Sequence, residues 1–229
     1  MDRRILSPEE LNRIQKAIAF KDLTSAEILM EVYDHYLSHL QGFSEEEFSQ
    51  ELFELEQKFT YGYCHALQAT LNKNAKSDIG KTQWMVIKKY FCASRWLFLV
   101  GILVIVFYVS TNARGKEELA ILLLSPLILL VIGNIAFSYQ NFKKLKPIKR
   151  TFKGIGFSIY SSLARPISER MYLPVLMAQV IVFVPKIAFP DLGYPPFLSA
   201  VAGIITVLLT LYTISLLEVW KIKSKTALI

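Results

Sequence analysis

The sequence predicts an all-α membrane protein, with a small cytosolic helical domain followed by a four-helix transmembrane bundle of two hairpins. Hydrophobic residues make up 53% of the 229 residues, and the mean hydropathy is +0.36. Charge is unevenly divided: residues 1–75 hold 7 Lys/Arg and 13 Asp/Glu, whereas residues 76–229 hold 19 Lys/Arg and 6 Asp/Glu. Because most of this positive charge flanks apolar runs, it indicates contact with lipid headgroups and not binding to nucleic acid.

Residues 1–75 contain three helix starts of one pattern, a Ser or Thr followed three residues later by Glu. The pairs are Ser7 with Glu10, Thr24 with Glu27, and Ser44 with Glu47. In each pair we expect the hydroxyl to cap the first turn and the Glu to reach back to the cap residue. Apolar residues at helical spacing follow each start, and the third helix is expected to continue past Gly62 to Leu71. A domain of this size has a marginal core, so we expect it to lean on a partner or on the membrane part.

The second of these helices carries Glu31, His35 and His39 on one face. Imidazoles one turn apart can bind zinc or another divalent metal. The alternative is a polar helix face with partly buried histidines. The sequence favours this alternative, because neither a Cys₂His₂ spacing nor an HExxH motif is present, and we expect no cofactor.

A family resemblance rests on the run from Glu27 to Leu71. Its matching residues are Ile28, Glu31, His35, Leu40, the turn Gly42-Phe43-Ser44-Glu45-Glu46, Phe48 and Leu52. This run resembles the HAAS-type, or permease-prefix, domain that precedes transmembrane segments in bacterial regulatory membrane proteins and permeases. The family usually has a Gly-x-Pro-like turn after its second helix, whereas residues 60–63 here contain no Pro. The resemblance implies a cytosolic signalling or assembly module in a bacterial inner membrane protein, without a catalytic residue.

Residues 76–95 form a basic juxtamembrane linker, in which Trp84 and Met85 lie among Lys81, Lys88 and Lys89. This composition predicts a segment lying at the level of the lipid headgroups. A nucleic-acid patch is the weaker alternative, since the charges adjoin an apolar span.

Four apolar segments, in the membrane domain 96–220 and the few residues just before it, are predicted to cross the bilayer. They are residues 92–111, 119–138, 171–189 and 197–219. Three polar residues lie inside them: Asn134, expected to face another helix, Gln179 and Lys186. Lys186 is near a span end, so snorkelling is the favoured interpretation and an ion pathway the alternative.

The cytosolic loop 139–170 contains the densest positive charge of the chain. Its candidate lipid- or partner-binding residues are Lys143, Lys144, Lys146, Lys149, Arg150 and Lys153. The positive-inside rule places this loop, residues 1–75 and the tail 221–229 in the cytosol. Apolar residues recur through the loop at helical spacing, which predicts an amphipathic helix on the inner leaflet. Docking of the loop onto the chain's own acidic domain is the alternative.

No motif in the sequence specifies a reaction: a Ser/His/Asp set, a P-loop and a glycine-rich nucleotide fingerprint are all missing. We therefore expect a non-enzymatic integral membrane regulatory or accessory protein. Its residues 1–75 are predicted to bind a protein partner, and its lysines are predicted to bind anionic lipid. We expect neither part to bind nucleic acid. A small transporter or channel subunit is the alternative. A metal-dependent membrane protein that uses the His35/His39 face is a second alternative. The chain could also form a homo-oligomer.

Overall fold

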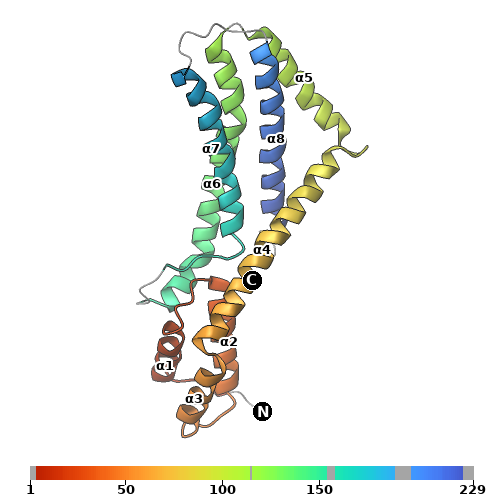
Figure 1. The fold of residues 1–229 in the computed structure, drawn as a ribbon. Coiled ribbons are helices and arrows are strands. Elements are labelled where there is room, and N and C mark those ends of the chain that lie inside the picture. Colours follow the sequence, from red (N-terminus) through yellow and green to blue (C-terminus); the bar gives the residue numbers. More distant parts are fainter. Residues whose placement is uncertain (1–3, 114, 154–157, 189–196, 224–229) are drawn as a thin grey trace. The chain divides into compact units, whose positions relative to one another are not determined.

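A computed structural model describes residues 4–113, 115–153, 158–188 and 197–223, and within these ranges the chain forms eight helices and no strand (Figure 1). The helices are α1 Pro8–Ala19, α2 Ala26–Leu40, α3 Phe48–Lys58, α4 Tyr61–Tyr90, α5 Trp96–Asn112, α6 Lys116–Thr151, α7 Arg165–Ala188 and α8 Phe197–Lys223. The predicted all-α fold class is confirmed.

The chain divides into two compact units. The helical unit comprises Met1–Lys76 with Gln140–Arg165, and the apolar unit comprises Ser77–Tyr139 with Pro166–Ala227. Both α4 and α6 contribute residues to each unit. The helical unit therefore combines the acidic N-terminal residues with the basic segment that follows the second predicted span.

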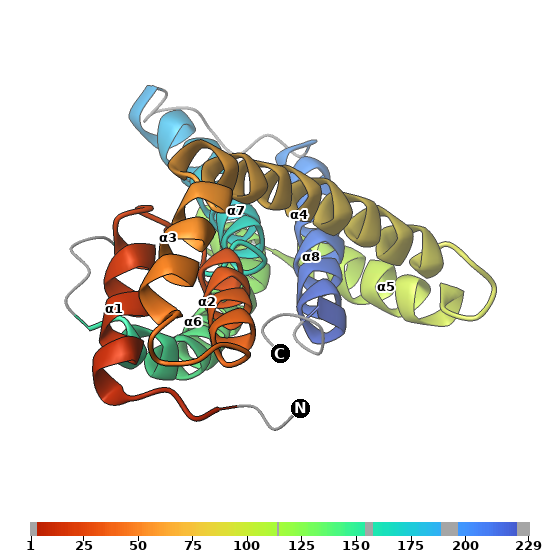
Figure 2. The same ribbon diagram turned by 90° about the horizontal axis from the view of Figure 1, so that it is seen from below.

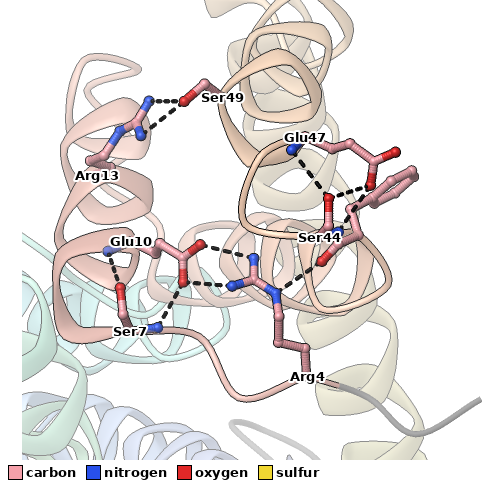
Figure 3. Close-up of polar contacts among 8 residues, drawn as sticks. Arg4, Ser7, Glu10, Arg13, Ser44, Glu47 and Ser49 are labelled. Atoms are coloured by element: carbon pink, nitrogen blue, oxygen red, sulfur yellow. Dashed lines mark hydrogen bonds and ion pairs between the residues drawn. The ribbon is translucent and has the colours of Figure 1, made fainter.

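The first predicted helix cap forms as expected. The Glu10 amide donates to the Ser7 hydroxyl at 3.3 Å, and the Ser7 amide donates to the Glu10 carboxylate at 2.7 Å (Figure 3). Arg4 adds a bidentate ion pair to Glu10, at 2.8 and 3.1 Å, and also donates to the carbonyl of Phe43 at 2.9 Å. The chain ahead of α1 is thus tied both to α1 and to the turn between α2 and α3.

The second predicted cap is wrong in its residue. The N-cap of α2 is Ser25 and not Thr24, and the Ser25 hydroxyl accepts the amide of Ile28 at 3.5 Å. The third pair, Ser44 with Glu47, does form reciprocal hydrogen bonds, at 3.0 and 3.4 Å. It lies in the turn before α3, which begins at Phe48.

The third predicted helix is broken where it was expected to continue. Phe59 has backbone angles of φ −93° and ψ 66°, which are not helical, and its side chain is buried in the core. The Thr60 hydroxyl then accepts the amide of Tyr63 at 3.3 Å, a new helix start. Helix α4 passes through Gly62 and ends only at Tyr90, so most of the predicted linker 76–95 is helical.

The core of the helical unit draws on both of its segments. From residues 1–76 it contains Ile14, Ile18, Leu29, Tyr36, Leu40 and Phe48 among others. From the second segment it contains Leu145, Ile148, Phe152 and Ile159. The ring of Tyr33 meets that of Phe152 edge-on, with centroids 5.3 Å apart. Figure 2 shows the C-terminal end of α6 beside α1 and α2. The small N-terminal domain thus gains core from residues far along the chain.

Two of the described helices, α6 and α8, are long and apolar enough to cross a membrane. They run over Ala120–Thr151 and Ser199–Lys223, with α5, of 17 residues, as a shorter apolar helix. Large apolar side chains on them are exposed, for example Phe107 at 70% and Ile204 at 62%. Soluble monomers rarely expose apolar surface on this scale, so this exposure favours contact with lipid.

The helix ends differ from those of the predicted spans. Helix α5 starts at Trp96, because residues 91–95 form a turn in which the Arg95 amide donates to the carbonyl of Cys92 at 3.0 Å. Helix α6 continues beyond residue 138 to Thr151, and so into the predicted loop. Gly203 of α8 lies against α5: an added Cβ would be 3.2 Å from the Ser110 hydroxyl.

The second half of α4 joins the apolar unit through polar contacts. The Gln83 side chain accepts from Arg170 of α7 at 2.7 Å and donates to Ser215 of α8 at 3.3 Å. Lys223 pairs with Asp78 at 2.6 Å. Trp84 and Met85 of the same helix are exposed.

Candidate functional site: a basic surface positioned by Glu27

Six cations of the helical unit lie on one exposed surface, at and just beyond the C-terminal end of α6. We call this set the basic surface, and it consists of Lys143, Lys144, Lys146, Lys149, Arg150 and Lys153, all of them exposed. Leu145, Ile148 and Phe152 alternate with them in sequence and are buried in the core of the unit. Helical spacing separates the two sets, so this end of α6 turns its apolar side inward and its charge outward.

The chain that follows the basic surface is attached to α2 by a cluster that we call the Glu27 junction, formed by Glu27, Ser25, Ser161 and Ser162. The Glu27 carboxylate accepts the amide of Ser162 at 2.9 Å and the hydroxyl of Ser161. The Ser162 hydroxyl donates to that of Ser25 at 2.7 Å. Ser25, Ser161 and Ser162 are buried, so these hydrogen bonds form away from solvent.

Backbone pairing beside the junction adds a second attachment. The Tyr160 amide donates to the carbonyl of Thr24 at 2.9 Å, and the Ala26 amide donates to the carbonyl of Tyr160 at 2.9 Å. From α4, the Gln68 side-chain oxygen accepts the amides of Thr24 and Ser25, at 3.0 and 2.9 Å. The amides at the start of α2 are therefore satisfied by groups distant in sequence. As a result, the N-terminal domain fixes the position of the chain leaving the basic surface.

Electrostatically, the helical unit combines opposite charges. Residues 1–75 carry a balance of −6, whereas residues 140–165 hold seven Lys/Arg and no Asp/Glu. Burial raises the pKa of the Glu10 carboxyl, but hydrogen bonds from Arg4 and Ser7 and the charge of Arg4 outweigh it, and the pKa lies below its usual value. Apolar packing, the Glu27 junction and the backbone pairing at Tyr160 attach the basic segment, and the six cations of the basic surface are exposed.

The histidines considered as metal ligands have other neighbours. His39 pairs with Glu51 of α3 at 2.8 Å, and His35 packs on the ring of Phe59 with centroids 5.8 Å apart. Both are exposed, as is Glu31. Within the described part of the chain, no three His, Cys, Asp or Glu residues are grouped in a way that could bind a metal ion. The His35/His39 face is a polar surface beside α3, and its two histidines are exposed, not partly buried as the favoured interpretation expected.

The polar residues predicted inside the spans are only partly described. Asn134 is half-buried, and its side-chain oxygen accepts the hydroxyl of Ser138, on its own helix, at 3.3 Å. The side chains of Gln179 and Lys186 lie outside the described residues.

The Glu27 junction was not predicted from the sequence. Glu27 stands at the position of a capping glutamate, and besides Ser25 its partners are 134 and 135 residues away. The only local signals are two hydroxyl pairs, Thr24-Ser25 and Ser161-Ser162, which are too common to indicate a contact.

Comparisons of the chain with protein families, with curated proteins and with solved structures found no match. The resemblance of residues 27–71 to the HAAS-type domain stays a prediction.

Proposed function

We propose that this chain is a non-enzymatic regulatory or accessory protein of a bacterial inner membrane, in which the cytosolic helical unit binds a protein partner. The observation that carries the partner is a pair of exposed aromatic side chains on α1 and α3. Phe20 at the end of α1 is 82% exposed, and Phe53 of α3 is 59% exposed. Aromatic side chains, Phe among them, are enriched at protein interfaces relative to the rest of the surface.

The two phenylalanines belong to neighbouring helices. Arg13 of α1 donates to the Ser49 hydroxyl of α3 at 3.1 and 3.2 Å (Figure 3), and Lys21 donates to the carbonyl of Glu56 at 3.4 Å. Phe20 and Phe53 lie between these two contacts along the α1–α3 pair. A partner could therefore cover both rings at once.

The membrane placement rests on the apolar helices and on the charge around them. Two described helices have the length and hydropathy of spans, and the basic surface begins five residues after the predicted span end at Ser138. Cations at this place interact with the anionic headgroups of the cytosolic leaflet, at about 1 kcal/mol per Lys or Arg near the surface. In this proposal the basic surface contacts lipid, which leaves the α1–α3 pair for the partner.

The packing of the helical unit decides how the partner should be sought. Deleting residues 1–75 would uncover Leu145, Ile148 and Phe152, so lost binding could reflect a damaged protein. Point variants avoid this problem. We would purify the full-length protein in mild detergent and identify co-purifying proteins by mass spectrometry. The wild type would be compared with Phe20→Ala, Phe53→Ala and the matched control Gln57→Ala, an exposed polar residue of α3.

A partner recovered with the wild type and with Gln57→Ala, but lost from both phenylalanine variants, is the expected result. Circular dichroism would verify that the variants keep the helical content and melting temperature of the wild type. Recovery of the same proteins with all four forms would reject the α1–α3 pair as the binding surface.

A further inference from the structure

The part of α4 that belongs to the apolar unit, residues 77–90, has two sides of different exposure. Four buried residues recur at spacings of three and four and so share one side of the helix: Ile79, Gln83, Val86 and Tyr90. Four exposed residues recur at the same spacings, offset by about half a turn, and we call them the α4 outer face: Lys81, Trp84, Met85 and Lys88. Trp84 and Met85 are 59% and 56% exposed, so both present large apolar side chains to their surroundings.

The contacts of the buried side show which level of the apolar unit α4 occupies. Gln83 accepts from Arg170 of α7 at 2.7 Å, one residue before the predicted span 171–189. Toward α8, Gln83 donates to Ser215 at 3.3 Å and Tyr90 donates to Glu218 at 3.0 Å. These two residues of α8 lie within about one turn of the end of the predicted span 197–219. The second half of α4 therefore lies at the level where these spans end on their predicted cytosolic side.

The outer face has the side-chain chemistry of a membrane surface. The Lys88 ammonium lies 5.7 Å from the centroid of the Trp84 ring. Tryptophan is enriched at the level of lipid headgroups, where its ring meets acyl chains and its N–H stays in polar surroundings. Lysine fits the same place, because its apolar stem can lie along lipid while its ammonium stays among the headgroups. Phe91 and Trp96, in and after the turn that follows α4, are exposed as well.

We propose that the α4 outer face is inserted into phospholipid at the level of the headgroups, with Trp84 and Met85 among the upper acyl chains. Lys81 and Lys88 then lie among the headgroups. The composition of residues 76–95 predicted only the level of this segment, whereas the burial pattern separates the side chains that hold α4 to α7 and α8 from those that enter lipid. This inference rests on the membrane placement in the proposed function, and it is independent of the protein partner.

The test is tryptophan fluorescence of the full-length protein in liposomes. The chain has three tryptophans, so Trp96→Phe combined with Trp220→Phe leaves Trp84 as the sole emitter. Lipids brominated in the upper acyl chain should quench Trp84 strongly, since the apolar face of an interfacial helix is buried about 5–10 Å into the boundary between headgroups and acyl chains. Aqueous iodide should quench Trp84 several times less than the tryptophan of the control, Gln57→Trp in a chain without other tryptophans. Gln57 is an exposed polar residue of α3.

Two results would overturn the proposal. Iodide quenching of Trp84 equal to that of the Gln57→Trp control would place the outer face in water. Protection of Trp84 from both quenchers would mean that protein, and not lipid, covers it. A form that keeps only Trp96, at the start of α5, separates these failures from that of the proposed function. Lipid quenching of Trp96 but not of Trp84 contradicts the α4 outer face alone, whereas lack of lipid quenching at both contradicts the membrane placement itself.

Discussion

The Glu27 carboxylate accepts the backbone amide of Ser162 at 2.9 Å, although 135 residues separate the two in the sequence. The same carboxylate accepts the hydroxyls of Ser25 and Ser161. In Glu27→Ala these donors lose a charged acceptor, and Ser25, Ser161 and Ser162 are all buried. We expect the helical unit to lose about 2–4 kcal/mol of stability, since each hydrogen bond to a charged group contributes about 1.5–3 kcal/mol and neighbouring bonds are not additive.

Hydrogen exchange is the measurement for Glu27→Ala, because it reports on each segment separately. We expect faster exchange at residues 159–163 and at the start of α2, with the apolar unit unchanged. The control is Glu31→Ala, one turn further along α2, where the side chain is exposed. Equal exchange in the two variants would show that the junction does not stabilise the unit.

The Glu10 carboxyl predicts a dependence of stability on pH. Burial alone would raise its pKa. The hydrogen bonds from Arg4 and Ser7 and the charge of Arg4 lower the pKa by a larger amount, so it lies below the usual 4.5. Because the folded state has the lower pKa, this carboxylate stabilises the fold above about pH 4.5, and the contribution disappears as pH falls through the folded pKa. Glu10→Gln should therefore melt at a lower temperature than the wild type at pH 7. The two melting temperatures should converge as the pH falls below 4.5 and the folded carboxyl becomes protonated, and a gap of constant size would exclude the ion pair as its cause.

The contrast between Glu10 and Glu27 shows what the sequence could predict. Glu10 is three residues after Ser7 and Glu27 is three residues after Thr24, so both fit the same capping pattern. Glu10 caps its own helix, because its partners Ser7 and Arg4 are within six residues. Glu27 pairs across the unit, because folding brings residues 161–163 to the start of α2. Local hydrogen bonds follow from spacing, whereas such long-range contacts do not.

Helix boundaries show a similar limit. The apolar runs indicated which segments could span a membrane, and two described helices have the required length and hydropathy. Hydropathy marks a change of environment and not the end of a helix, so it did not predict that α6 continues to Thr151. Likewise, the break at Phe59 arises where this ring enters the core, which depends on packing across the whole unit.

Tyr36 offers a test of core packing. Its hydroxyl is buried and finds no hydrogen-bond partner among the described residues, and burial raises the pKa of its phenol strongly. An enclosed hydroxyl without a partner costs its lost hydration. Tyr36→Phe should therefore leave the unfolding free energy unchanged or raise it by up to about 1 kcal/mol. Thermal melting compares it with Tyr33→Phe, a half-buried neighbour on the same helix. A loss of more than 1 kcal/mol would mean that the Tyr36 hydroxyl has a partner after all.

The two cysteines should differ sharply in reactivity. Cys64 is buried, and burial raises the pKa of its thiol despite the nearby charge of Lys21, whereas Cys92 is exposed. Since the thiolate is the reactive form, maleimide at pH 7 should modify Cys92 at least about 100-fold faster than Cys64. In Cys92→Ser the remaining thiol should react only after denaturation. Rapid labelling of folded Cys92→Ser would show that the core around Cys64 opens readily.

The predicted topology can be tested from single cysteines placed in a Cys64→Ala, Cys92→Ala background. Asn112→Cys lies at the end of α5, before the turn predicted to be outside, and Lys149→Cys lies on the basic surface, predicted to be cytosolic. A membrane-impermeant maleimide added to intact spheroplasts should label the first, and in inverted vesicles it should label the second. This result follows if α6 crosses the bilayer between the two positions, because a span of about 20 residues separates its ends by about 30 Å of hydrocarbon. Labelling of both positions from the same side would mean that α6 does not cross. The proposed contact of the basic surface with anionic headgroups of the cytosolic leaflet would then be wrong.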